Sequence, residues 1–299
     1  MGKYEYLKTI TFDMVKSKLP KRSPESHKGD FGKLLCICGS KSMPGAAYFC
    51  VESALRCGVG LVRAAIPESI YGSVSSKISE CTYVICDDDE NGNIDKSSIE
   101  NILKVAKECS AVAIGCGMGW NENTKFIVNN LVESCDKPMV IDADGINVIS
   151  ENIDILKKAK NKIVLTPHAK EAERLLNVDC GEINSNKRIY AQKLADDYGV
   201  VAVMKGHNTV VADKKEKAFL NLTGSSGMAK GGSGDVLTGI IGSFLAQGME
   251  PLDAALCGVY IHGKSGDYCK KKYSERFMLP TDIIRGLNDI FLTFENGVN

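Results

Sequence analysis

The feature that most constrains the fold of this chain is a regular alternation of short apolar runs with longer amphipathic segments. The apolar runs have the length of strands, and stretches patterned like helices separate most of them. This rhythm predicts βαβ units, and therefore an α/β fold with a mostly parallel central sheet and helices on both faces. The expected strands are KLLCICG (33–39), GLVRAAI (60–66), CTYVIC (81–86), SAVAIG (110–115), PMVID (138–142), KIVLT (162–166) and VVAVMK (200–205).

Two further apolar runs follow too closely for a crossover helix. NTVVAD (208–213) and KAFLNL (217–222) come directly after VVAVMK, so we expect an antiparallel extension at one edge of the sheet. From Asp235 onward the pattern is almost entirely helical. One α/β domain over residues 1–299 accommodates the whole pattern.

Charge and cysteine content restrict the partners and the compartment. Lys and Arg number 37 and Asp and Glu number 37, so we expect neither nucleic acid nor an anionic membrane as a partner. The twelve cysteines contain no C-x-x-C pair, which indicates reduced, buried thiols. The amino-terminal MGKYEYLKTI has no apolar signal core, so we expect a cytoplasmic protein.

A glycine-rich segment, residues 224–234, leads into an apolar run of helical spacing from Val236 to Gln247. We call this segment the glycine loop. Its exposed amides and the positive end of the helix dipole favour an anion such as phosphate, and Asp235 adds a carboxylate at the same place. The alternative is that Asp235 is only a helix N-cap that follows a tight loop.

Polar and glycine-rich segments follow five of the expected strands: GSKSMPGAA, GCGMGW, DADGIN, TPHAKEAE and KGHNTVV. Each of them alone is compatible with an ordinary turn. In open parallel sheets, however, ligands bind beyond the carboxyl ends of the strands. Five such segments together with the glycine loop therefore favour a binding site over a set of unrelated turns.

The residue types suit phosphoryl transfer without a Walker loop. Asp142 and Asp144 offer the oxygen ligands that Mg²⁺ prefers, directly or through water. Lys205 and Thr209 can contact a nucleotide phosphate, while the amides of the glycine loop surround the transferring phosphates. Asp235 then faces the acceptor hydroxyl group and takes its proton.

A formal Walker match, GVYIHGKS at Gly258–Ser265, is rejected. The Walker motif works only as a loop between a strand and a helix. The flanking sequence here has the apolar spacing of one continuous helix. We therefore expect His262 to be a helix residue near the site or in the core.

Over nearly its full length the chain resembles the ADP- or ATP-dependent NAD(P)H-hydrate dehydratase family of the ribokinase-like superfamily. The resemblance rests on SHKGDFGKLL, GSKSMPGAA, GCGMG, DADGIN, LTPHAKEAE, KGHNTVV and GMAKGGSGDVLTGIIGSFLAQG. It implies a ribokinase-like three-layer αβα sandwich. It also implies repair of NADH and NADPH hydrated at the nicotinamide ring, through phosphorylation of the ring hydroxyl group and elimination of phosphate, with the S epimer as substrate and ADP converted to AMP.

The resemblance also implies roles for particular residues. Asp235 resembles the catalytic base, and the Gly234 amide resembles part of an anion hole. Glu171 follows His168 by three residues, so on a helix it contacts His168 or joins Asp142 and Asp144 as a ligand of Mg²⁺. The implied nucleotide contacts are Lys205, Gly206, His207, Asn208, Thr209, Gly231, Gly232 and Gly234, and the implied contacts to the hydrated nicotinamide nucleotide are Ala46, Gly117, His168 and Asp235.

The chain departs from the family pattern at two loops, with Ser225 and Ser226 in place of an asparagine–proline or asparagine–glycine pair and Cys116 in place of proline. The resemblance further implies a homotetramer and, since we expect no epimerase domain here, a separate epimerase for the other substrate epimer. The choice between ADP and ATP stays open. Two alternative functions also stay open: a small-molecule kinase for a vitamin-precursor alcohol, and a non-catalytic nucleotide sensor.

Overall fold

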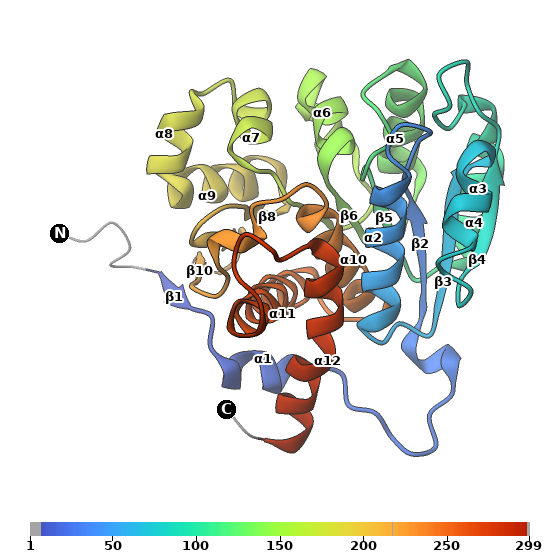
Figure 1. The fold of residues 1–299 in the computed structure, drawn as a ribbon. Helices are drawn as coiled ribbons and strands as arrows, with labels where there is room; N and C mark the ends of the chain where they lie inside the picture. The colour runs from blue at the N-terminus through green and yellow to red at the C-terminus, as the bar shows by residue number, and fades with distance from the viewer. Residues whose placement is uncertain (1–6, 217, 298–299) are drawn as a thin grey trace.

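A mostly parallel sheet runs through the computed structural model, which describes residues 7–216 and 218–297 (Figure 1). Within these residues the sheet has ten strands in the order β1-β10-β9-β8-β7-β6-β5-β2-β3-β4. Strand β9 is antiparallel to β8 and β10, and the other neighbouring pairs are parallel. The strands are β1 (Lys8–Thr9), β2 (Lys33–Ile37), β3 (Leu61–Pro67), β4 (Thr82–Cys86), β5 (Ala111–Ile114), β6 (Met139–Ile141), β7 (Ile163–Leu165), β8 (Val201–Met204), β9 (Thr209–Ala212) and β10 (Phe219–Asn221).

Helices cover both faces of the sheet. Successive side chains of a strand point to opposite faces, so Leu34 and Cys36 of β2 lie in one core while Leu35 and Ile37 lie in the other. The first core contains side chains of α1–α3 and α10–α12, and the second contains those of α4–α9. The α-helices are α1 (Phe12–Lys18), α2 (Pro44–Arg56), α3 (Glu68–Ser75), α4 (Ile99–Glu108), α5 (Glu122–Ser134), α6 (Ala143–Glu151), α7 (Ala169–Leu176), α8 (Cys180–Ser185), α9 (Lys187–Tyr198), α10 (Ser233–Ala246), α11 (Pro251–Lys272) and α12 (Pro280–Asn296). The short 3₁₀ helices are η1 (Lys28–Phe31), η2 (Lys96–Ser98), η3 (Ile153–Lys158) and η4 (Ser226–Met228).

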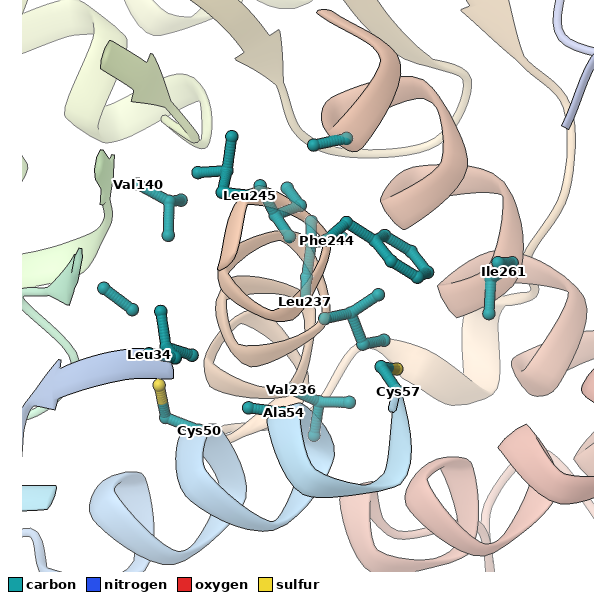
Figure 2. Close-up of a cluster of buried hydrophobic side chains, with 14 of the residues drawn as sticks. Leu34, Cys50, Ala54, Cys57, Val140, Val236, Leu237, Phe244, Leu245 and Ile261 are labelled. Atoms are coloured by element: carbon teal, nitrogen blue, oxygen red, sulfur yellow. The ribbon is translucent and has the colours of Figure 1, made fainter. Parts of the chain in front are cut away.

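Helix α10 lies inside the first core, enclosed by the sheet, α2 and α11. Figure 2 shows side chains of α10 beside those of α2, and Ile261 of α11 nearby. The two helices approach closely at Gly239, where an added Cβ would lie 2.1 Å from the carbonyl oxygen of Cys50. This packing holds the amino end of α10, and with it Asp235, in one place.

Every one of the seven runs expected to form parallel strands contains a strand, and β9 and β10 form the expected edge. Lys217, the first residue of the expected run KAFLNL, lies outside the described residues. Strand β1, a two-residue strand that pairs with β10, was not predicted. Its two side chains are exposed, so no apolar alternation marks it. The Walker-like stretch lies inside α11, which confirms its rejection.

The cysteines behave as buried thiols. All twelve lie within the described residues, all are free, and all except Cys180 are buried. Burial raises the pKa of thiols such as Cys57 and Cys86, which keeps them protonated. None of the described helices combines the length and apolar character needed to span a membrane. Of the amino-terminal stretch MGKYEYLKTI, residues 1–6 lie outside the described part of the chain.

Candidate active site

The structure brings the five polar segments to one edge of the sheet. They follow β2, β5, β6, β7 and β8, which are consecutive neighbours in the strand order and run parallel. Their carboxyl ends therefore lie side by side (Figure 1). The amino end of α10 reaches the same edge, because a Cβ added at Gly234 would lie 3.4 Å from both Asp142 Oδ2 and Lys205 Nζ.

A buried ion pair stands at the centre of this edge. Lys205 Nζ, at the end of β8, donates to Asp142 Oδ1, at the end of β6, over 2.5 Å. Thr238 Oγ1 of α10 donates to the other oxygen, Asp142 Oδ2, over 2.7 Å. Glu171 Oε2 lies 3.8 Å from Lys205 Nζ. One ammonium group therefore faces two carboxylates, and both oxygens of Asp142 have partners.

The pair is charged at neutral pH. Burial alone would raise the pKa of Asp142, but the charge and hydrogen bond of Lys205 outweigh burial and lower it. Burial would likewise lower the pKa of Lys205, but the charges of Asp142 and Glu171 raise it to about 12. The positive charge of Lys205 is therefore compensated by carboxylates of the protein itself.

His168 and Glu171 form a capping box at the start of α7. Glu171 N donates to His168 Nδ1 over 3.2 Å, and His168 N donates to Glu171 Oε2 over 2.7 Å. Burial raises the pKa of Glu171 to about 7, although Lys205 opposes this shift. Helix α7 begins at Ala169, and His168 is its N-cap. The predicted contact between Glu171 and His168 is confirmed.

Asp235 lies in the first turn of α10 but does not cap the helix. The N-cap is Gly232, with φ of 99°, so the N-cap alternative for Asp235 was wrong. Burial and the charge of Asp142 raise the pKa of Asp235 to about 7, although a hydrogen bond from the Cys116 thiol opposes the shift. A carboxyl group that titrates near neutral pH is suited to accept a proton at that pH.

Three buried polar atoms around the glycine loop have no hydrogen-bond partner among the described residues. They are Ser225 Oγ and Ser233 Oγ of the loop and its helix, and His262 Nε2 of α11. Burial and the charge of Lys205 lower the pKa of His262 to about 4, and its ring contacts the backbone of Ser233. This agrees with the expectation that His262 lies near the site. Buried polar atoms without partners indicate a place where a ligand or water completes the hydrogen bonding.

Ala46 of α2 meets Gly117 of the GCGMG segment, which follows β5. A Cβ added at Gly117 would lie 2.5 Å from the Cβ of Ala46, so these two residues are in contact. The amide of Gly119 in the same segment donates to Asp144 Oδ2 over 2.8 Å. Asp144 therefore holds the GCGMG segment, and burial raises its pKa.

Asp142, Asp144 and Glu171 do not fit a metal ion held by their three side chains. The described residues contain no group of three or more His, Cys, Asp and Glu side chains arranged to hold a metal ion. Both oxygens of Asp142 already accept hydrogen bonds, from Lys205 and Thr238, and Asp144 accepts one from Gly119. The ammonium of Lys205 lies where a cation between Asp142 and Glu171 would bind. Their role as ligands of Mg²⁺ stays a prediction.

The segment expected to bind nucleotide forms the turn between β8 and β9. Gly206 and His207 are exposed, Asn208 has φ of 59°, and Thr209 Oγ1 donates to the carbonyl oxygen of Gly206 over 3.0 Å. Lys205 begins this turn and faces inward, toward Asp142. Of the loop glycines, Gly234 meets the ion pair, whereas Gly231 is exposed with no atom near its added Cβ.

Two polar residues of this region, Thr238 and Lys187, were not predicted from the sequence. Thr238 is a fully buried polar residue in the mostly apolar run of α10, one helical turn after Gly234. Its position, one turn after Gly234, could have indicated a residue of the site. Lys187 is buried beneath the turn after β8, and no pattern in its surrounding polar sequence marks it as buried.

The fold and the site together define a class. A mostly parallel sheet between two helical layers, with a glycine loop that enters a buried helix at the carboxyl edge, is the ribokinase-like fold. A sequence profile described as NAD(P)H-hydrate dehydratase matches residues 34–288. The chain belongs to the NAD(P)H-hydrate dehydratase family.

Three similar proteins illustrate the relationship. The chain is 33% identical over 255 residues to the ADP-dependent (S)-NAD(P)H-hydrate dehydratase of Neisseria meningitidis, covering 84% of this chain and 81% of that protein. It is 33% identical over 289 residues to the bifunctional NAD(P)H-hydrate repair enzyme of Moorella thermoacetica, covering 97% of this chain but 54% of that protein. The chain thus spans about half the length of such bifunctional relatives. The crystal structure of the ADP/ATP-dependent NAD(P)H-hydrate dehydratase of Bacillus subtilis superimposes with a TM-score of 0.84 at 29% identity, covering 97% of this chain and 99% of that one.

Proposed function

We propose that this protein catalyses the nucleotide-dependent dehydration of the S epimer of hydrated NADH and NADPH, with ADP converted to AMP and phosphate. The observation that carries the proposal is Asp235, a carboxyl group with a pKa of about 7 in the first turn of α10, directly after the glycine loop. The relative from Neisseria meningitidis, named for this reaction, supports the substrate and the nucleotide.

The proposed chemistry has two steps. Asp235 takes the proton of the hydroxyl group on the hydrated ring while the hydroxyl oxygen attacks the β-phosphorus of ADP, and the bond from that phosphorus to the bridging oxygen breaks to release AMP. The ring nitrogen then expels the new phosphate from the adjacent carbon, and the neighbouring carbon loses a proton. The ring double bond is restored, and the elements of water leave as part of the phosphate and a proton.

The proposed contacts form two sets, one for each ligand. Nucleotide contacts are proposed for the turn 205–209 and for Gly231, Gly232 and Gly234, whose amides lie beside the positive end of α10. Contacts to the hydrated nicotinamide nucleotide are proposed for His168 and for the touching pair Ala46 and Gly117. Asp235 would lie between the two ligands, as a base that serves the acceptor must.

We propose that ADP or ATP serves as the phosphoryl donor, together with Mg²⁺. The relative from Bacillus subtilis is described as ADP/ATP-dependent and was co-crystallised with ATP/Mg²⁺. We also propose that the protein is a cytoplasmic homotetramer, as the family resemblance implies. We propose further that it depends on an epimerase activity for the other epimer, because relatives such as that of Moorella thermoacetica are bifunctional.

The two alternative functions are less well supported. A vitamin-precursor kinase shares the fold and the base, but the family profile over residues 34–288 favours the dehydratase. A non-catalytic nucleotide sensor needs no proton acceptor, whereas the environment of Asp235 raises its pKa to about 7. That tuning favours catalysis over binding alone.

Chemically hydrated NADH mixed with the protein and ADP tests the proposal. We expect the absorbance of the reduced nicotinamide to return, with one AMP and one phosphate formed for each molecule repaired. A kinase of another alcohol would leave the chromophore absent, and a sensor would bind ADP without forming AMP. Either result would refute the proposed reaction.

A further inference from the structure

Lys187 is a buried cation beneath the turn after β8. It is the first residue of α9, and only 7% of its surface is exposed. Its Nζ donates to the carbonyl oxygen of His207 over 2.7 Å. No carboxylate of the described residues pairs with it. Burial lowers its pKa, and no neighbouring charge contributes to that shift.

Two physical effects disfavour an ammonium group at this position. It has lost much of its hydration, and a single carbonyl oxygen replaces only part of it. Lys187 also lies at the positive end of α9, whose first turn contains no acidic residue. Lys205 contrasts with it, because Asp142 and Glu171 balance the charge of Lys205. Lys187 is therefore an uncompensated positive charge at this edge of the sheet.

The turn after β8 rests directly on this ammonium group. A Cβ added at Gly206 would lie 2.6 Å from Lys187 Nζ, so the backbone passes immediately over it. Gly206 has φ of 130°, a conformation that glycine adopts readily and other residues do not. Gly206 and His207 are themselves exposed. Lys187 thus fixes the shape of the turn from below, while the upper side of the turn is open to a ligand.

We propose that Lys187 is a positioning residue for the nucleotide: it holds the turn 206–208 in place and supplies the positive charge that a phosphate of ADP neutralises. The proposal rests on the nucleotide contacts proposed above for this turn. A bound phosphate lowers the energy of a buried cation without a counter-ion, so the unfavourable charge in the free protein becomes favourable in the complex. Lys205, already paired with two carboxylates, cannot supply that charge to the same extent.

The test is Lys187→Met, with Lys187→Arg as the variant that keeps the charge and Lys193→Met as the matched control. Lys193 lies on the same helix but is half exposed and pairs with Asp197. Calorimetry with ADP and with adenosine separates the phosphate contribution from that of the base and sugar. We expect Lys187→Met to weaken the binding of ADP roughly tenfold or more and to change the affinity for adenosine less than about threefold. Without ligand, the variant should have a higher melting temperature than the wild type. Lys187→Arg restores most of the ADP affinity.

In turnover assays, Lys187→Met should raise the KM for ADP by a similar factor while the KM for the hydrated cofactor stays within about twofold. A lower melting temperature of Lys187→Met, together with equal losses of affinity for ADP and for adenosine, would show that Lys187 is merely structural and would overturn the proposal. If Lys187→Met does not fold, Lys187→Gln, which keeps a neutral N–H donor, provides the same comparison. A wild-type protein that binds ADP but repairs no cofactor would refute the proposed function and leave this inference standing, whereas one that does not bind ADP would refute this inference.

Discussion

Replacement of Asp235 by Asn removes the proposed base and keeps the size of the side chain. The proposed nucleotide contacts come from other residues, so ADP affinity should change little. Turnover should fall by a factor of about 10² to 10⁴, the range expected when a positioned base is lost. Because the pKa of Asp235 is about 7, the wild-type kcat/KM should rise as the pH increases through 7, and the variant should lack this rise.

The same substitution should stabilise the protein at alkaline pH. The pKa of Asp235 is raised from 3.8 to about 7, so folding favours its protonated form. The contribution of the protonated Asp235 to the free energy of unfolding is fully present below about pH 4. It is lost as the pH rises through 7, where the folded carboxyl group ionises. At about 1.4 kcal/mol for each pKa unit, the loss by pH 8 is at most about 4 kcal/mol. The Asp235→Asn variant avoids this loss. Its free energy of unfolding should therefore exceed that of the wild type by more at pH 8 than at pH 5.

Three measurements check this reasoning: single-turnover rates of cofactor repair, ADP calorimetry, and denaturant unfolding at pH 5 and pH 8. Asp197→Asn is the matched control, because Asp197 is an exposed partner of Lys193 on α9. It should leave all three values near those of the wild type. Near wild-type turnover in Asp235→Asn would remove Asp235 from the mechanism. A stability gain that does not depend on pH would show that the carboxyl group is not ionising within the folded protein near pH 7.

Lys205→Met should destabilise the protein by about 3 to 5 kcal/mol in denaturant unfolding, because its buried carboxylate partners lose their counter-ion; unchanged stability would contradict the ion pair. Gly234→Val should weaken ADP binding in calorimetry, since a Cβ at this position already lies 3.4 Å from Lys205 Nζ. Gly231→Ala should not weaken ADP binding, because a Cβ at position 231 meets open space. His168→Ala should raise the KM for the hydrated cofactor but not for ADP, and cost about 1 kcal/mol of stability as a lost cap; if only stability changes, His168 is structural.

The order of strands and helices was predictable because it depends on local periodicity. Each buried parallel strand reads as a short apolar run, and each helix that covers it reads as an amphipathic segment. The position of the site was predictable for a related reason. Five polar segments follow strands that turn out to be neighbours, and parallel strands bring their carboxyl ends to one edge. The two-residue strand β1 is too short and too exposed to carry such a signal.

The sequence by itself thus determined the sheet, its helical layers, and the glycine loop that leads into the buried helix with Asp235. Only the tertiary structure decided which charged groups at that edge of the sheet pair with one another and which, among the described residues, are left without a partner. Lys205 and Asp142 are 63 residues apart, and their pairing depends on β6 and β8 lying close in the sheet. The burial of Lys187 depends likewise on α9 packing beneath a turn of another element. Charge compensation and desolvation act through space between distant segments, so no local pattern of residues records them.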